Sequence, residues 1–247
     1  MGHLIMKTLF IIPCAIMIGD EKAEHLDRFF QLLHTIDSIT SRFKDPEIRI
    51  YELSGKTMYP LFYKQLESCR LVTTQNDSKV LNIKETAKDV NLLVTDEIRP
   101  IYEKGYIKNA TESLIISRVL DEIDPTEFDR VFKITGRYFF TPSFLISNHN
   151  TKGKITLKDK SKCHHGKKYT MTDSLRHCIC WSYCTSIHEQ VRDRFRKIHE
   201  YIIDHANGKG IASIENGLVL FFEEDLVNSV KSTGCAGKVD GRQYHFD

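Results

Sequence analysis

Short, continuously apolar segments alternate along this chain with longer segments whose apolar positions have helical spacing. Residues 7–16, KTLFIIPCAI, form the first apolar run, which is typical of a central strand in a parallel sheet covered on both faces. From Asp20 or Glu21 onward the spacing is that of an amphipathic helix, and this pattern stops before Pro46. The segment IRIYEL, residues 48–53, predicts the second strand.

The rest of the chain continues the alternation of strands and helices. Further strands are expected at 70–75, at 131–140, at 154–159 as an exposed edge strand, and at 177–184. Further helices are expected at 60–68, at 83–123 with a break at Lys104–Gly105, at 186–205 after the capping box of Ser186 and Glu189, and from Ser213 to 230. This alternation predicts an α/β layered fold, in which helices flank a mostly parallel central sheet.

We expect residues 1–247 to form a single domain, because no linker or internal repeat divides the chain. Residues 148–168 are polar and predict an insertion or lid, and residues 232–247 predict a loop-like tail. A content of 41% hydrophobic and 28% charged residues is that of an ordinary globular protein with a sizeable core. The formal net charge of +2 argues against a dedicated nucleic-acid binder, which usually carries a large basic excess.

Two further features bear on where the protein works. Seven cysteines without the regular spacing of a disulfide scaffold favour a reduced, cytoplasmic protein. The N-terminal apolar run contains Pro13, is too short to span a membrane, and is not followed by a small-x-small cleavage site. We therefore expect a buried strand there, and neither a signal peptide nor a membrane span.

A stretch in the middle of the chain carries charges inside an apolar strand. Within DRVFKITGRYFF, residues 129–140, Lys133, Gly136 and Arg137 interrupt a pattern otherwise typical of a buried strand. Glycine leaves room for the close approach of another group, and arginine offers a planar fork of donors that suits a phosphate. The alternative is a strand end from which the two cations extend to solvent.

The motif FKITGRY, preceded by an acidic helix and a Phe-Asp pair, resembles the central strand of certain viral and bacterial glycosyltransferases of the GT-A, nucleotide-diphospho-sugar transferase type. The resemblance extends over residues 7–225. It implies a GT-A-like, Rossmann-like fold and a hexosyl- or pentosyltransferase activity in glycan biosynthesis. In such proteins the central strand ends beside the donor's diphosphate, which implies that Lys133, Gly136, Arg137 and Tyr138 contact the nucleotide sugar.

The chain departs from the family at one important point. Most GT-A enzymes place an Asp-x-Asp pair at the end of this strand, where it holds a divalent metal, and this sequence contains no such pair. The developing charge of the leaving nucleoside diphosphate is stabilised either by a metal or by fixed cations. Lys133 and Arg137 are the candidates for fixed cations, while Mn²⁺ or Mg²⁺ held by scattered carboxylates stays an open alternative.

Ligands of open α/β sheets bind beyond the carboxyl ends of the strands, which brings three predicted loops together. Pro13 to Asp20 follows the first strand, and Gly136 to Thr141 follows the central strand. The third loop supplies hydroxyl, amide and carboxylate groups suited to a base and ribose, and it consists of Thr73, Thr74, Gln75, Asn76 and Asp77. The alternative for this third loop is a simple polar turn.

Sugar transfer with inversion needs a carboxylate or a histidine that takes the proton of the acceptor hydroxyl. Glu215 is the first candidate, because GT-A folds often supply the base from a late helix that starts beside the substrate. An acid in the first turn of a helix also complements the helix dipole without any catalytic role. Asp173 and Glu112 are weaker candidates, and Glu112 has the alternative roles of pairing with Lys108 or orienting Arg137.

Cysteines and histidines gather in one part of the chain, at Cys163, His164, His165, His177, Cys178, Cys180, Cys184 and His188. Zinc accepts such ligands, but no Cys-x2-Cys pair occurs, and buried free cysteines are the alternative. In a strand at 177–184 the three cysteines would share one face. The lysine-rich segment 152–168 is compatible with a solvated loop, with a lid over diphosphate, or in third place with a nucleic-acid face.

Together with the resemblance, these patterns predict a glycosyltransferase that moves a sugar from a nucleotide-diphosphate-sugar donor to an acceptor hydroxyl on a glycan or glycoconjugate, with inversion. One alternative is a nucleotidyltransferase on a similar sheet, which would need acidic metal ligands at the strand ends. The other is a non-catalytic zinc- or sugar-binding module.

Overall fold

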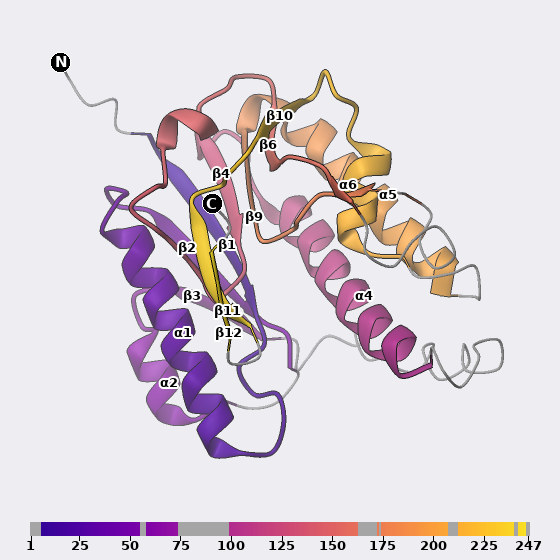
Figure 1. The fold of residues 1–247 in the computed structure, drawn as a ribbon. Coiled ribbons are helices and arrows are strands. Elements are labelled where there is room, and N and C mark those ends of the chain that lie inside the picture. Colours follow the sequence, from indigo (N-terminus) through magenta and orange to yellow (C-terminus); the bar gives the residue numbers. More distant parts are fainter. Residues whose placement is uncertain are drawn as a thin grey trace.

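A seven-stranded sheet with helices on both faces forms the centre of the molecule (Figure 1). The computed structural model describes residues 6–54, 58–73, 99–162, 172, 174–206, 212–239 and 242–245. The strand order is β10 (Val227–Val230), β6 (Ile155–Lys158), β9 (Cys180–Cys184), β4 (Arg130–Ile134), β1 (Thr8–Cys14), β2 (Glu47–Glu52) and β3 (Arg70–Thr73). All of them run in one direction except β9, which is antiparallel to both of its neighbours. The predicted α/β fold with a mostly parallel sheet is therefore confirmed.

Helices cover the two faces of the sheet in two groups (Figure 1). One face carries α1 (Lys22–Thr40) and α2 (Pro60–Gln65), and the other carries α4 (Arg99–Glu122), α5 (His188–Ala206) and α6 (Ile214–Phe221). None of the helices in the described part of the chain has the length and apolar character of a membrane span.

The central strands β1 and β4 are rich in apolar residues because each contributes side chains to both faces. On the α1 side, Phe10 of β1 and Phe132 of β4 stack with ring centroids 5.1 Å apart. On the α4 side, Val131 of β4 packs in the same buried cluster as Trp181 of β9. Successive strand residues point to opposite faces, so a strand covered on both sides shows the continuous apolar run of residues 7–16 rather than an alternating pattern.

Several short elements complete the fold. A small antiparallel sheet has the order β12 (Arg242–His245), β11 (Cys235–Val239), β5 (Tyr138–Phe140), and a two-stranded sheet pairs β7 (Ser161–Lys162) with β8 (Ser174–Leu175). Two 3₁₀ turns, η3 (Ile146–His149) and η4 (Thr185–Ile187), precede β6 and α5.

The structure differs from the predicted elements in several places. The strand at 154–159 is not at an edge, because β6 lies between β9 and β10 with Ile155 and Leu157 fully buried. Helix α4 runs without a break through Lys104–Gly105, and α6 ends at Phe221, so that the following apolar residues form β10 instead. The predicted loop-like tail contains the hairpin of β11 and β12.

The predicted central strand is in fact two strands separated by a turn. Main-chain hydrogen bonding closes the turn, since the Tyr138 amide donates to the Thr135 carbonyl at 2.9 Å. The Gly136 amide donates to the Pro13 carbonyl of β1 at 3.1 Å. A Cβ at Gly136 would lie 2.7 Å from the Cβ of Cys14, so the close packing of the turn on β1 requires glycine.

Gly136→Ala is expected to lower the free energy of unfolding by roughly 1–3 kcal/mol, because an added methyl group overpacks this part of the core. Urea unfolding of the two proteins measures the difference. Gly153→Ala is the matched control, since a Cβ at Gly153 meets nothing within 4 Å and reports only the cost of its positive φ of 66°. Equal stability of wild type and Gly136→Ala would contradict the packing argument.

Candidate active site

The carboxyl ends of β1, β2, β3 and β4 lie at the same edge of the sheet, because these strands are parallel. Strand β9 runs the other way, so its amino end reaches this edge, with Cys180 paired with Ile134. The turn that carries Gly136 and Arg137 is attached on both sides here, to Pro13 of β1 and, through the Thr135 amide at 3.0 Å, to the carbonyl of Ile179. The structure thus places the central motif where α/β folds bind ligands.

A fully buried ammonium group lies at the end of β4. Lys133 Nζ donates to Glu112 Oε1 of α4 at 2.7 Å, to Thr135 Oγ1 at 2.9 Å, and to the carbonyl oxygen of Cys178. An ammonium group has three hydrogens, so these partners use all of them. In this arrangement Lys133 neither extends to solvent nor has a donor left for a diphosphate, and it acts on the site through its partners.

Glu112 is the counter-charge of Lys133, and its side chain is 12% exposed. Burial alone would raise the pKa of Glu112, but the positive charges of Lys133, Lys108 and Arg137 outweigh it and lower the pKa below its usual value. A carboxylate that is held ionised in this way is a poor general base. Of the roles considered for Glu112, the geometry favours a positioning role beside Lys133 and Arg137.

Arg137 is half-buried and differs from Lys133 in its bonding. Within the described part of the chain, no side-chain hydrogen bond or ion pair holds its guanidinium group. Its charge nevertheless acts to lower the pKa of Glu112 and of Tyr138, so the group belongs to the same charged region. Lys108, exposed on α4, adds a second cation to the same region. Arg137 and Lys108, rather than Lys133, are therefore the cations placed to meet an anionic ligand.

Tyr138 shows which charged groups the fold brings together. Burial raises the pKa of its phenol, Arg137 and Lys133 act to lower it, and Glu112 and Glu215 act to raise it. Glu215 also acts to raise the pKa of the Cys178 thiol, which burial brings to about 12. Glu215, predicted from a segment far along the sequence, thus lies in the same region as the central motif.

The first turn of α6 is held in place by three other parts of the chain. Ser213 caps the helix by accepting from the Asn216 amide at 3.2 Å, and the Ile214 amide donates to Asn109 Oδ1 of α4 at 3.2 Å. The buried Asn216 side chain donates to Thr172 Oγ1 at 2.7 Å. The carbonyl of Glu215 itself accepts from the Arg176 amide at 3.1 Å. The main chain that carries Glu215 is therefore fixed, and its half-buried side chain carries a charge that acts on Tyr138 and Cys178.

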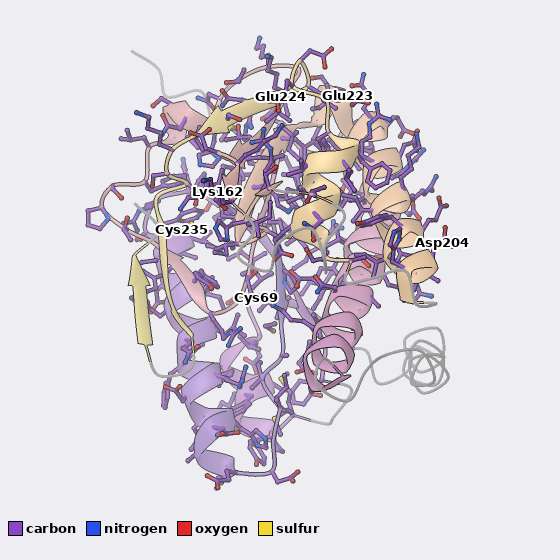
Figure 2. All side chains as sticks on the ribbon, turned by 45° about the vertical axis from the view of Figure 1, so that its right-hand side comes forward. Cys69, Lys162, Asp204, Glu223, Glu224 and Cys235 are labelled. Carbon is purple, nitrogen blue, oxygen red and sulfur yellow. The ribbon has the colours of Figure 1, made fainter. Side chains whose placement is uncertain are left out.

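Arg176 is a residue that sequence reasoning missed. Its guanidinium is buried and donates to the Lys158 carbonyl at 2.9 Å, to Ser229 Oγ at 2.8 Å and to Glu224 Oε2 at 3.2 Å. Figure 2 shows Glu224 beside Glu223, on the turn that joins α6 to β10. Arg176 thus ties the segment that supports α6 to the sheet, and no local pattern distinguishes it from an exposed arginine.

Glu52, the last residue of β2, was also missed. It is fully buried, and it accepts from the Ile16 amide at 2.9 Å and from the Ser54 amide and hydroxyl at 3.0 and 2.7 Å. Its carboxylate shapes the loop that follows β1 at the site edge. An acid that ends an otherwise apolar strand, as in IRIYE, is the signal that could have identified it.

Several predicted site residues are not placed. Thr73 is the last residue of β3, which ends at the site edge, as predicted for the third loop. Thr74, Asn76 and Asp77 lie outside the described residues, and so does Asp173.

The cysteine and histidine cluster does not form a zinc site in the described part of the chain. Cys178 and Cys180 belong to buried clusters on opposite faces of the sheet, so the prediction that they share a face was wrong. The reason is that regular strand alternation begins only at Cys180. His188 is hydrogen-bonded to the Tyr183 hydroxyl at 2.8 Å and to the Leu120 carbonyl at 3.0 Å. Cys163, His164 and His165 are outside the described residues.

The described residues also do not offer the carboxylate cluster that a divalent metal needs. Among them, no group of three or more His, Cys, Asp or Glu side chains is arranged to hold an ion. Glu112, which lies beside the central motif, is bonded to Lys133. We therefore assign no metal to these residues.

Comparison with known proteins gives a fold neighbour but no sequence family. No protein-family model matches the chain, and no curated protein sequence matches it. Among solved structures, the galactosyltransferase LgtC in complex with donor and acceptor sugar analogs matches 92% of this chain and 73% of its own, with a TM-score of 0.52 and 10% identity. A protein from Aquifex aeolicus VF5 matches 91% of this chain and 86% of its own, with a TM-score of 0.41 and 13% identity.

The likeness to LgtC shows that this chain has the GT-A fold of glycosyltransferases. The fold implied by the FKITGRY resemblance is thereby confirmed, whereas the motif itself is not tested by this comparison.

Glu112→Gln is expected to lower the free energy of unfolding by roughly 3–5 kcal/mol near neutral pH, because it leaves the buried Lys133 ammonium without its counter-charge. The pKa of Glu112 is lower in the folded than in the unfolded chain. Its contribution is therefore complete above the unfolded value of about 4.3 and is lost as pH falls through the folded pKa. The difference between the two proteins should shrink below about pH 4, as measured by urea unfolding across pH.

Glu223→Gln is the control for this comparison. Glu223 bonds Arg194 at 2.8 Å, but its side chain is 57% exposed and solvent screens the pair, so stability should change little at any pH. A Glu112→Gln effect as small as that of the control, or one that stays constant into the acid range, would show that the buried pair does not stabilise the fold.

Proposed function

We propose that this protein is a glycosyltransferase, which transfers a sugar from a nucleoside-diphosphate-sugar donor to a hydroxyl of a glycan or glycoconjugate with inversion. The observation that carries the proposal is the position of Arg137. It follows the central strand of a GT-A fold, on a turn attached to β1 and β9, beside the Glu112–Lys133 pair. The donor analog bound to LgtC is in keeping with a donor of this class.

In the proposed reaction the acceptor oxygen forms a bond to the anomeric carbon while the bond from that carbon to the phosphate oxygen breaks. The electron pair of the broken bond leaves with the nucleoside diphosphate, where negative charge increases. Fixed donors aimed at that charge stabilise the transition state. Arg137 takes this role, with Lys108 as a second cation, and Lys133 contributes by holding Glu112 and Thr135 in place.

The acceptor hydroxyl loses its proton as its oxygen attacks. Glu215 is the proposed base, because its charge is present beside Tyr138 and its main chain is fixed by Ser213, Asn109 and Arg176. Held in this way, a carboxylate stays within reach of a substrate without rearrangement of the helix. Asp173 remains the alternative base.

The nucleoside is assigned to the loop after β3. Thr73, Thr74, Asn76 and Asp77 supply the hydroxyl, amide and carboxylate groups for this role, and Thr73 ends a strand at the site edge. Pro13 and Gly136 are assigned a steric role beside the diphosphate, because the Gly136 amide already donates to the Pro13 carbonyl, and Tyr138 contributes its phenol.

Arg137→Ala is expected to weaken binding of nucleoside diphosphates by about 10- to 100-fold, because a hydrogen bond from a charged group contributes roughly 1.5–3 kcal/mol. Titration calorimetry with UDP, GDP, CDP, ADP and dTDP, with manganese and with chelator, identifies the base and measures the loss.

Arg194→Ala is the matched control, since its guanidinium is similarly half-buried but lies on α5 and pairs with Glu223. If Arg137→Ala binds nucleoside diphosphates as tightly as wild type does, the central motif is not part of the donor site. If wild type binds no nucleoside diphosphate but does bind free glycans, the non-catalytic sugar-binding alternative replaces the transferase.

Glu215→Gln is expected to lower kcat by about 100-fold or more while donor affinity stays unchanged, because only the proton-accepting group is removed. Release of nucleoside diphosphate from a donor sugar in the presence of acceptor provides the rate, and Glu223→Gln serves as the surface control. A variant with the wild-type rate would return the role of base to Asp173.

A further inference from the structure

In the hairpin of β11 and β12, strand β11 pairs with β5, the strand that begins at Tyr138 of the central motif. Strand β11 is antiparallel to β5, with Gly237 opposite Tyr138, Ala236 opposite Phe139 and Cys235 opposite Phe140. Figure 1 shows this hairpin in yellow, and Figure 2 labels Cys235 at its start. None of the roles assigned above uses it.

Gly237 lies in contact with Tyr138 and Arg137, two motif residues that are assigned to the donor site above. A Cβ at this position would be 2.6 Å from Cε1 of Tyr138 and 2.7 Å from the carbonyl oxygen of Arg137. Side-chain Cβ atoms essentially never lie this close to another heavy atom, so a Cβ at Gly237 would force the Tyr138 ring or the Arg137 carbonyl to shift. The absence of a side chain at Gly237 therefore lets the Tyr138 ring lie against the backbone of β11.

The entry to the hairpin is fixed as well. Gly234 has a positive φ of 68°, and its carbonyl accepts from the Thr141 amide at 2.9 Å and from the Thr141 hydroxyl at 3.1 Å. A Cβ at Gly234 would lie 2.8 Å from the Cβ of Phe144. These contacts prevent the start of β11 from sliding along β5. A side chain added at Gly237 would therefore displace Tyr138 and Arg137 rather than the hairpin.

The ring of Tyr138 is the link between Gly237 and the charged groups. It is 7% exposed, and the charges of Arg137, Lys133, Glu112 and Glu215 all act on its hydroxyl. A displaced ring would move this hydroxyl among those groups, and a displaced Arg137 carbonyl would move the turn that carries the guanidinium.

We propose that Gly237 is a positioning residue of the donor site, which holds the Tyr138 ring and the Arg137 main chain so that the Tyr138 hydroxyl and the Arg137 guanidinium meet the diphosphate of a nucleoside-diphosphate sugar. The hairpin of β11 and β12 is then a part of the binding site as well as of the fold. This inference rests on the proposed function.

Gly237→Ala tests the proposal, with the nucleoside diphosphate that binds wild type as the probe. Its dissociation constant should rise by about 10-fold or more, comparable to the loss in Arg137→Ala, because the geometry of charged hydrogen bonds is disturbed. Ala236→Val is the matched control, because it adds bulk to the neighbouring residue of the same strand, whose side chain points to the opposite face. Thermal unfolding of each variant gives the stability against which binding is compared.

A second pair of variants keeps the test decisive if Gly237→Ala does not fold. Tyr138→Ala removes the ring that the new methyl group would meet. In that background Gly237→Ala meets only the Arg137 carbonyl, so it should destabilise the fold less than it does in wild type. Any further loss of affinity should be smaller than the loss that Gly237→Ala causes in wild type, since changes that act through a shared contact are not additive. Tyr138→Ala itself should bind more weakly than wild type.

Three results would overturn the inference. In the first, Gly237→Ala binds like wild type. In the second, Ala236→Val loses as much affinity as Gly237→Ala, which would make the hairpin a support of the fold alone. In the third, Tyr138→Ala binds like wild type, or Gly237→Ala loses at least as much affinity in the Tyr138→Ala background as it does in wild type. A wild-type protein that binds no nucleoside diphosphate would instead remove the proposed function, and this inference with it.

Discussion

The buried ammonium group of Lys133 is the constraint on which the rest of the site depends. An unpaired charge in a protein interior costs several kcal/mol, so the fold has to supply partners on every side. They come from three separate elements: the Glu112 carboxylate of α4, the Thr135 hydroxyl of the turn, and the Cys178 carbonyl that precedes β9. Satisfying one cation thus fixes how α4 lies on the sheet, how the turn is shaped, and how the chain enters β9.

The same arrangement decides the electrical character of the region. Among the described groups whose charges act on Glu112 or Tyr138, the cations are Lys133, Lys108 and Arg137 and the carboxylates are Glu112 and Glu215, and the buried Lys133–Glu112 pair neutralises itself. The cations among these groups that remain unpaired within the described residues are the exposed Lys108 and the half-buried Arg137. This GT-A-like fold, whose sequence has no Asp-x-Asp pair, thus carries cationic side chains at the end of its central strand.

Local patterns were enough to predict the layered fold, because burial on one or both faces leaves a mark in the sequence itself. The run 7–16 and the helix after Glu21 are such cases, and β1 and α1 lie within them. The errors arose where a distant contact decides the outcome. The segment around Gly136 has the sequence pattern of a strand, but hydrogen bonds to the carbonyls of Pro13 and Ile179 hold it as a turn. The sequence around Lys133 is compatible with an exposed cation, but in the structure Lys133 is buried and pairs with Glu112, 21 residues earlier. Strand β11 likewise pairs with β5, which is far from it in the sequence.

The pairing of β5 with β11 also has a consequence for the order in which the protein becomes competent. Thr141 and Gly234, which fix this pairing, are 93 residues apart in the chain. Contacts between such distant segments form late, because closing the intervening loop costs entropy before any contact rewards it. During synthesis a nascent chain that has released β9 already contains Lys133, Glu112 and Arg137, but it still lacks β11. The nascent chain therefore contains these charged residues before the strand that packs on Tyr138, and the candidate site is complete only after β11 has been synthesised and has paired with β5.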